Sequence, residues 1–308
     1  MKRSRLASYL IILLTYAIAI IGGYFLFTIL PGDNNNGNSV LLKLLIVDGV
    51  ATVWVWMVGM IFNNASVYDP YWSVAPVAMI IGYAVAREAY NPYVIVIMVL
   101  IGIWGLRLTI NWAMGFKNLR VQDWRYAQLK EKHPKLWLLI NLFGICMMPT
   151  IVVFIAMLPA FQYIEVITTG VAAQSLGNFL GMLVVVAGIT IETLADIQMH
   201  QFKSIAANAD LVNDHGLWSV SRHPNYLGEI MFWFGICVMG ISFYEQNGFT
   251  NSWVLIMSPI IVLLLFAYIS IPMMEKRQLS RKPAYKEYKE NTNMLLIFPG
   301  KSKKHKDQ

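Results

Sequence analysis

The chain has 308 residues, of which 57% are hydrophobic and only 13% are charged. This composition, with a mean hydropathy of +0.54, excludes an ordinary soluble globular protein and predicts an integral membrane protein. We attribute the formal net charge of +7 to attraction for anionic lipid headgroups, and not to nucleic-acid binding.

Apolar stretches long enough to cross roughly 30 Å of hydrocarbon recur along the chain. They lie near residues 7–30, 40–62, 92–116, 136–160, 176–199, 224–243 and 252–273, with a shorter eighth near 73–87. We therefore predict an all-α, polytopic transmembrane helix bundle of about eight spans, forming a single integral membrane domain over residues 1–308. Lys and Arg gather in alternate connections, which places both termini in the cytoplasm by the positive-inside rule.

Several features carry no predicted chemistry. The first apolar segment follows a basic start but exceeds 20 residues and lacks a small-residue cleavage site, so we interpret it as a retained anchor. Cys146 and Cys237 lie inside apolar spans, where cysteine behaves as a small hydrophobe, and neither a disulfide framework nor a metal site is predicted. Residues 301–308 form a basic tail.

The first dense polar group is the segment NNASVYDPYW, residues 63–72, between the second and third apolar stretches. It contains Tyr68, Asp69 and Tyr71, and the predicted topology places it on the cytoplasmic side. So many hydrogen-bonding groups between apolar spans suit the floor of a pocket. The alternative is a capping turn, in which Asp69 caps a helix that starts at Pro70.

The span near 176–199 carries a polar stripe on its cytoplasmic half. Glu192, Asp196, His200 and Lys203 follow one another at spacings of four, four and three, so they share one helical face. A single acidic residue there is often a structural hydrogen-bonding group. Four polar residues on one helical face indicate that this face lines a cavity.

A basic turn precedes the next span in the segment LWSVSRHPNYLGE, residues 217–229. Pro224 suits the first helical position, which puts Arg222 and His223 at the positive end of the helix dipole, in an arrangement that favours an anion. Asn225 and Glu229 are four residues apart and project from one helical face. Such charge at the start of a membrane helix predicts a functional site.

The last span runs into the segment MMEKRQLSRKPAYKEYKE. Arg277 and Arg281 are four residues apart, and Pro283 breaks or restarts the helix after them. We interpret the later lysines, Lys282, Lys286 and Lys289, as exposed to solvent or lipid.

These polar groups all fall in the cytoplasmic half of the predicted bundle, whereas the external half is almost purely apolar. A cavity with charged and aromatic walls at one end and apolar walls at the other fits a phosphate-bearing cofactor that meets a lipid-soluble substrate. The sequence contains neither a GxGxxG motif after a strand nor a GxxxxGK[ST] motif, so side chains and helix ends must hold any nucleotide.

The motifs GLWSVSRHPNYLGE, ETLADIQMHQFK and IPMMEKRQLSRKPAYKEYKENTN resemble the membrane-embedded steroid 5-alpha-reductase family. The segments YDPYWSVAP, WGLRL and QDWRY resemble its bacterial DUF1295-type branch and extend the likeness over most of the chain. Similar RHPxY turns occur in sterol reductases and in isoprenylcysteine or phospholipid methyltransferases. The likeness is strongest over residues 188–299, which it marks as the cofactor-binding region.

The resemblance implies a bound NADPH and a set of residues that contact it. These residues are Asp196, Lys203, Arg222, His223, Asn225, Tyr226, Glu229, Arg277 and Arg281. The chain departs from the steroid enzymes at three points. It has Glu192 where they place an asparagine, it lacks their Gln-Glu pair on an early span, and it has Trp104 near the position of their substrate-gripping tyrosine.

We therefore expect an NADPH-dependent reductase of an activated carbon-carbon double bond in a lipophilic, steroid-like or isoprenoid-like enone, with its active site toward the cytoplasm. Tyr68, Asp69 and Tyr71 are the candidate proton donors or orienting groups. The alternative is a methyltransferase that uses S-adenosylmethionine on a lipid or prenylated thiol. A transporter or lipid-binding scaffold is a third reading, although neither repeated halves nor a polar path through the bilayer is visible.

Overall fold

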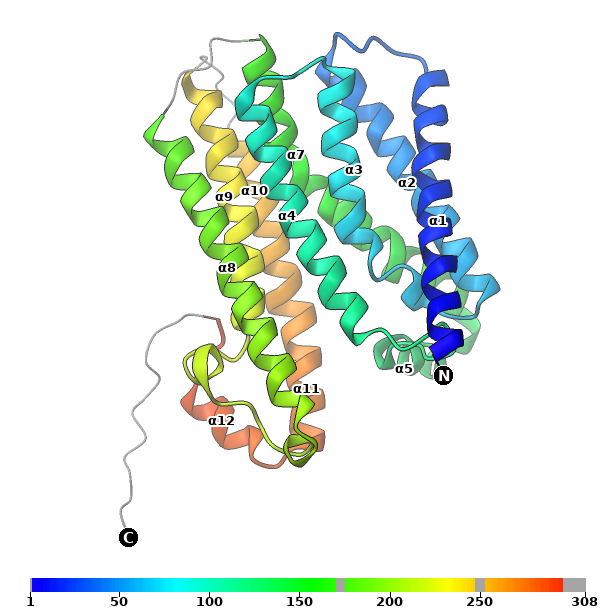
Figure 1. The fold of residues 1–308 in the computed structure, drawn as a ribbon, viewed down its shortest axis with the longest axis vertical. Coiled ribbons are helices and arrows are strands. Elements are labelled where there is room, and N and C mark those ends of the chain that lie inside the picture. The colour runs from blue at the N-terminus through cyan, green and yellow to red at the C-terminus, as the bar shows by residue number, and fades with distance from the viewer. Residues whose placement is uncertain (1, 170–174, 247–252, 296–308) are drawn as a thin grey trace. The chain divides into compact units, whose positions relative to one another are not determined.

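The structure is a computed structural model that describes residues 2–169, 175–246 and 253–295 (Figure 1). The basic tail predicted at 301–308 lies outside the described residues. The chain divides into two compact units, unit 1 (Met1–Ala172) and unit 2 (Ala173–Gln308), and each unit is described by itself. The regular elements of the described residues are helices, and a single isolated parallel bridge joins Ser221 to Asn293.

Unit 1 consists of long helices joined by short helical turns. In chain order they are α1 (Lys2–Ile29), α2 (Gly37–Ile61), η1 (Ala65–Val67), α3 (Tyr71–Ala86), α4 (Pro92–Gly115), α5 (Trp124–Lys132), η2 (Pro134–Leu136), α6 (Trp137–Leu139), the π-helix η3 (Ile140–Met147) and α7 (Met148–Thr169). Asn36, Asn91 and Asp123 accept backbone N–H groups at the starts of α2, α4 and α5, as N-cap residues do.

Unit 2 has the same construction, and a short helix is the last element among its described residues. Its elements are α8 (Leu176–Ser204), η4 (Ala206–Asn208), η5 (Gly216–Ser219), α9 (Pro224–Gln246), α10 (Trp253–Leu265), the π-helix η6 (Phe266–Ser270), α11 (Ile271–Arg281) and α12 (Tyr285–Asn291). The predicted break at Pro283 is confirmed, because α11 ends two residues before it and α12 begins two residues after it.

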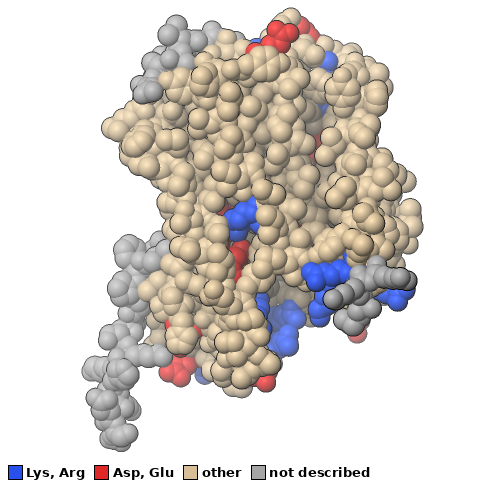
Figure 2. Space-filling view, in the orientation of Figure 1, with Lys and Arg blue, Asp and Glu red and all other residues tan. Residues whose placement is uncertain are grey.

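Seven helical segments of the described chain are long and apolar enough to cross a membrane, which confirms the predicted all-α polytopic architecture. They are Ser4–Ile29, Gly37–Ile61, Pro92–Gly115, Pro134–Thr168, Leu176–Ser204, Pro224–Ser242 and Leu255–Arg281. The predicted eighth span corresponds to α3, which has 16 residues. Uncharged residues cover most of the helices in the face shown in Figure 2. The cytoplasmic placement of the termini remains a prediction.

Glycines bring α8 and α9 into direct backbone contact, and these helices run side by side in Figure 1. A Cβ atom on Gly188 would lie 2.7 Å from the carbonyl oxygen of Gly228, and one on Gly181 would lie 2.9 Å from that of Gly235. Small residues at a helix interface allow this approach, which is a common way to pack helices in membranes. The α8–α9 pair therefore carries the predicted polar residues of these two helices on closely packed backbones.

Candidate functional site

The three predicted catalytic residues lie at the start of α3 in unit 1, and each one bonds a different partner. The Tyr68 hydroxyl lies 2.7 Å from Thr150 Oγ1, and the Tyr71 hydroxyl donates to Asp48 Oδ1 at 2.7 Å. The carboxylate of Asp69 accepts from another residue, on α5. Asp48, to which the sequence analysis assigned no role, is therefore the group that orients the Tyr71 hydroxyl.

Asp69 does not cap a helix, so the capping alternative is wrong. The α3 helix begins at Tyr71 with Pro70 at its N-cap position, and no side chain caps it. Instead, Asp69 Oδ1 accepts a hydrogen bond of 2.6 Å from the Tyr126 hydroxyl. Burial raises the pKa of the Asp69 carboxyl to about 6, although the Tyr126 hydrogen bond and the charge of Arg125 lower it in part.

This raised pKa predicts how stability depends on pH. The folded pKa lies above the model-peptide value of 3.8, so the folded protein holds this proton more tightly than the unfolded chain does. The stabilisation is complete at low pH and is lost as the pH rises through about 6. Between pH 5 and 7.5 we expect the natural protein to lose about 1 kcal/mol of unfolding free energy relative to Asp69→Asn.

Unfolding in detergent at the two pH values measures this difference. The matched control is Glu131→Gln, which changes an exposed carboxylate on α5. If Asp69→Asn and Glu131→Gln follow the same pH dependence as the natural protein, the Asp69 carboxyl titrates normally.

In unit 2, the start of α9 is held by an ionic cluster around one carboxylate. The helix begins at Pro224, as predicted. The carboxylate of Glu275, on α11, lies 2.8 Å from Arg222 Nε, 3.3 Å from His223 Nε2 and 2.6 Å from Lys289 Nζ. The Glu275 side chain is only 5% exposed, so these basic groups balance a buried negative charge.

Arg222 also ties the chain that follows α12 to the start of α9. Its Nη1 group donates to the carbonyl oxygens of Lys289, at 2.9 Å, and of Thr292. Its backbone N–H donates to the carbonyl oxygen of Asn293 at 2.8 Å. Arg222, predicted as a cofactor contact, is therefore engaged with the protein through its side chain and its backbone.

The sequence analysis left Glu275 out of the site and misjudged two of the lysines. Lys289 pairs with Glu275, and Lys282 Nζ donates to the carbonyl oxygen of Leu211, so the interpretation of both as merely solvated is wrong. Lys286 is exposed. A signal for Glu275 was present, because it is the only acidic residue in the stretch 253–281.

An aromatic stack continues from the ionic cluster along α9. The rings of His223 and Tyr226 are nearly parallel at 7° with centroids 5.4 Å apart, and Tyr226 stacks on Phe266 at 4.6 Å. Phe266 opens the π-helix η6, an element that is often found at functional sites. Two predicted cofactor contacts, His223 and Tyr226, are thus brought together.

The other predicted residues of α9 differ in burial. Asn225 is half-buried, whereas Glu229 is buried and accepts a hydrogen bond of 2.8 Å from Trp233 Nε1. Because this hydrogen bond occupies one oxygen of the Glu229 carboxylate, a ligand that contacts Glu229 must share the carboxylate with Trp233.

The predicted stripe on α8 passes from buried to exposed along the helix. Glu192 is 4% exposed, Asp196 and His200 are half-buried, and Lys203 is exposed near the end of the helix. The burial of the stripe therefore decreases toward the end of the helix.

Four cations gather where α8 and α11 end, and we call them the basic group: Lys203, Arg277, Arg281 and Lys282. Lys203 interacts electrostatically with Lys282 and Arg277, and Asp196 supplies an opposite charge. Partial burial lowers the pKa of the Lys282 ammonium group, and the positive charge of Arg281 lowers it further. The cations of the basic group therefore repel one another.

The basic group and the Glu275 cluster lie on different faces of α11. At about 100° per residue, Leu279 lies about 40° around the helix from Glu275, whereas Arg277 and Arg281 lie about 200° and 240° from it. Among the predicted cofactor residues, Arg222 and His223 therefore belong to the Glu275 cluster, whereas Lys203, Arg277 and Arg281 belong to the basic group.

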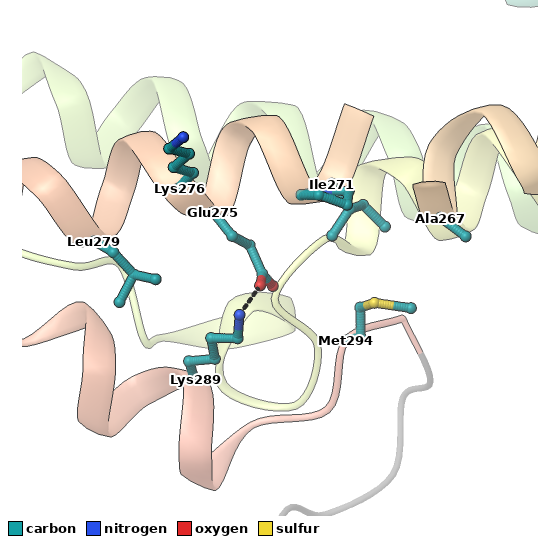
Figure 3. A pocket seen from close by; sticks show the side chains of 8 residues that line it. Ala267, Ile271, Glu275, Lys276, Leu279, Lys289 and Met294 are labelled. Atoms are coloured by element: carbon teal, nitrogen blue, oxygen red, sulfur yellow. Dashed lines mark ion pairs between the residues drawn. The ribbon is translucent and has the colours of Figure 1, made fainter. Parts of the chain in front are cut away.

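A pocket of about 290 Å³ lies on the Glu275 face of α11, between this helix and the chain around α12 (Figure 3). Its lining residues are Ala267, Ile271, Pro272, Glu275, Lys276, Leu279, Lys289 and Met294. Neither Arg277 nor Arg281 lines it.

Comparison with known proteins gives a family likeness over most of the chain. The family model described as "Protein of unknown function (DUF1295)" matches residues 55–292, a range that contains all the predicted site residues. A protein of Schizosaccharomyces pombe described as uncharacterized is 24% identical over 229 residues, which are 67% of this chain and 65% of that protein. The chain thus spans slightly less than two thirds of the length of this relative. No solved structure matches the chain.

Proposed function

This chain belongs to the DUF1295 family of steroid 5-alpha-reductase-like membrane proteins, and from that premise we propose that it is an NADPH-dependent reductase. The resemblance predicted from its motifs is confirmed by the family match. The proposed reaction reduces an activated carbon-carbon double bond in a lipophilic enone, with the site open toward the cytoplasm.

The observation that carries the proposal is the mutual repulsion within the basic group. Cations held close together favour a ligand with several negative charges. NADPH carries a pyrophosphate and a 2′-phosphate, whereas S-adenosylmethionine carries a positive sulfonium centre. The charge of the basic group therefore favours NADPH over the methyl donor.

In this proposal, residues of unit 2 bind the cofactor in two ways. Lys203, Arg277 and Arg281 bind phosphate groups, while His223 and Tyr226 offer aromatic faces. When bound, NADPH supplies the hydride. Arg222 has partners within the protein and holds the start of α9 in place, whereas Glu229 accepts a hydrogen bond from Trp233 within α9.

The proposal assigns the substrate carbonyl to Tyr68, Asp69 and Tyr71. A hydroxyl or a protonated carboxyl group stabilises negative charge on a carbonyl oxygen, and general acids contribute about 10²- to 10⁴-fold to rate. Asp48 orients the Tyr71 hydroxyl, and Tyr126 orients the Asp69 carboxyl. These hydrogen bonds hold the Tyr71 hydroxyl and the Asp69 carboxyl in fixed positions.

Cofactor titrations of the full-length protein in detergent test the proposal. We expect NADPH to bind more tightly than NADH, and S-adenosylmethionine not to compete. Arg277→Gln and Arg281→Gln should each weaken NADPH binding about 10-fold, because each removes a charged hydrogen-bond donor. Arg281 is exposed, so its replacement leaves the packing of α11 intact.

The matched control is Lys286→Gln, which removes one positive charge from an exposed position on α12. It should leave NADPH affinity unchanged. Tight binding of S-adenosylmethionine without NADPH binding would establish the methyltransferase alternative. Equal losses of NADPH affinity in Arg281→Gln and Lys286→Gln would show that only the net charge of the protein matters.

A further inference from the structure

The pocket between α11 and the chain around α12 has the two-sided chemistry of an amphiphile site. Figure 3 shows Ile271 and Leu279 on the side of α11 that faces Met294, while Glu275 points to Lys289 across the pocket. The apolar side chains and the charged ones thus occupy different parts of the same wall. A ligand that fills it needs both an apolar part and a charged part.

The charges around this pocket leave an excess of positive charge. One carboxylate, Glu275, faces Arg222 and Lys289, and Lys276 adds a third cation among the lining residues. Lys276 is exposed. The charged part of the ligand is therefore an anion.

The helix that lines the pocket is apolar on its surface just before the pocket's charges. In the adjoining η6 turn, Tyr268 is 76% exposed and Ile269 is 50% exposed. This helix belongs to the span Leu255–Arg281, in which the basic residues follow the apolar ones. A site at that junction lies where a membrane helix meets lipid headgroups.

We propose that this pocket binds an anionic phospholipid, with Lys289 contacting the headgroup phosphate, the exposed Lys276 adding positive charge at the rim, and an acyl chain lying along Ala267 and Ile271. The site lies on the face of α11 opposite Arg277 and Arg281, so it is separate from the proposed cofactor residues of the basic group. The bound lipid would also brace the chain around α12 against α11, because Lys289 and Met294 come from that chain.

Native mass spectrometry of the full-length protein tests this inference by counting bound lipids. Phosphatidylglycerol and phosphatidylcholine with identical acyl chains are titrated separately. We expect tighter binding of phosphatidylglycerol, with a loss of about fivefold in Lys276→Gln and about 25-fold when Lys289→Gln is added, since each lysine near a membrane surface contributes about that factor. Ala267→Phe fills the apolar part without a change of charge and should also weaken phosphatidylglycerol binding.

Lys286→Gln is the charge control and should bind phosphatidylglycerol as the natural protein does. Equal affinity for the two lipids, or unchanged binding in both Lys276→Gln and Ala267→Phe, would overturn the inference. Full displacement of phosphatidylglycerol by inorganic phosphate would overturn it too, because the site would then be a free-phosphate site. NADPH titration of Lys276→Gln separates failure of this inference from failure of the proposed function, since the affinity of this variant for NADPH should equal that of the natural protein.

Discussion

Glu275→Leu is expected to lower the free energy of unfolding by about 3–5 kcal/mol, because it leaves buried positive charge without a counter-charge. The Arg222 side chain is 10% exposed and that of His223 is 9% exposed, so water cannot take the place of the lost carboxylate. Unfolding by sodium dodecyl sulfate, followed by circular dichroism, measures the change. We expect the variant to unfold at a clearly lower detergent fraction than the natural protein.

Glu290→Leu is the matched control, because it removes an exposed carboxylate from α12. It should change stability by less than about 0.5 kcal/mol. The double variant Glu275→Leu with Arg222→Leu should recover part of the loss, since removing both members of a buried pair is often neutral. If Glu275→Leu and Glu290→Leu unfold alike, Glu275 does not hold this cluster together.

Gly188→Leu is expected to separate α8 from α9 and to prevent stable folding of unit 2. Even a Cβ atom at this position would lie 2.7 Å from the Gly228 carbonyl oxygen and 2.8 Å from the Phe232 backbone nitrogen. These are backbone atoms, which cannot rotate away as a side chain can. Gly188→Ala alone should cost about 3 kcal/mol, at the upper end of the usual overpacking range, and the leucine variant should yield little monodisperse protein in size-exclusion chromatography.

Gly49→Ala is the control for glycine replacement within a membrane helix. A Cβ atom there has no neighbour within 4 Å, and alanine favours the helix by about 0.5–1 kcal/mol. We therefore expect unchanged or slightly higher stability. A monodisperse, normally stable Gly188→Leu protein would show that α8 and α9 do not pack through these glycines.

The predicted spans agree with the observed helices to within a few residues at most ends. Two ends differ most: the span predicted near 136–160 continues to Thr168, and the last span, predicted near 252–273, continues to Arg281. Hydropathy detects where a helix leaves the hydrocarbon, whereas a helix satisfies its own backbone hydrogen bonds and can extend further. That extension puts Glu275 on a helix, facing the start of α9.

The polar positions were visible in the sequence, but their partners were not. The Arg222–Glu275 pair is separated by 53 residues, and the Asp69–Tyr126 pair by 57. Arg87 and Glu165, paired at 2.8 Å, are 78 residues apart, and their pairing was not predicted from the sequence. Spacing rules apply within one helix, so they cannot find contacts between helices.

The sequence by itself determined that this chain is a polytopic helical membrane protein, because apolar segments of bilayer length must form helices to satisfy their backbone in lipid. It also determined where α9 begins, since proline is compatible with the first turn of a helix and not with its interior. Only the tertiary structure decided which cations face Glu275 and which face one another, because the rotation of α11 about its axis is set by packing. That rotation separates the pocket at Glu275 from the basic group.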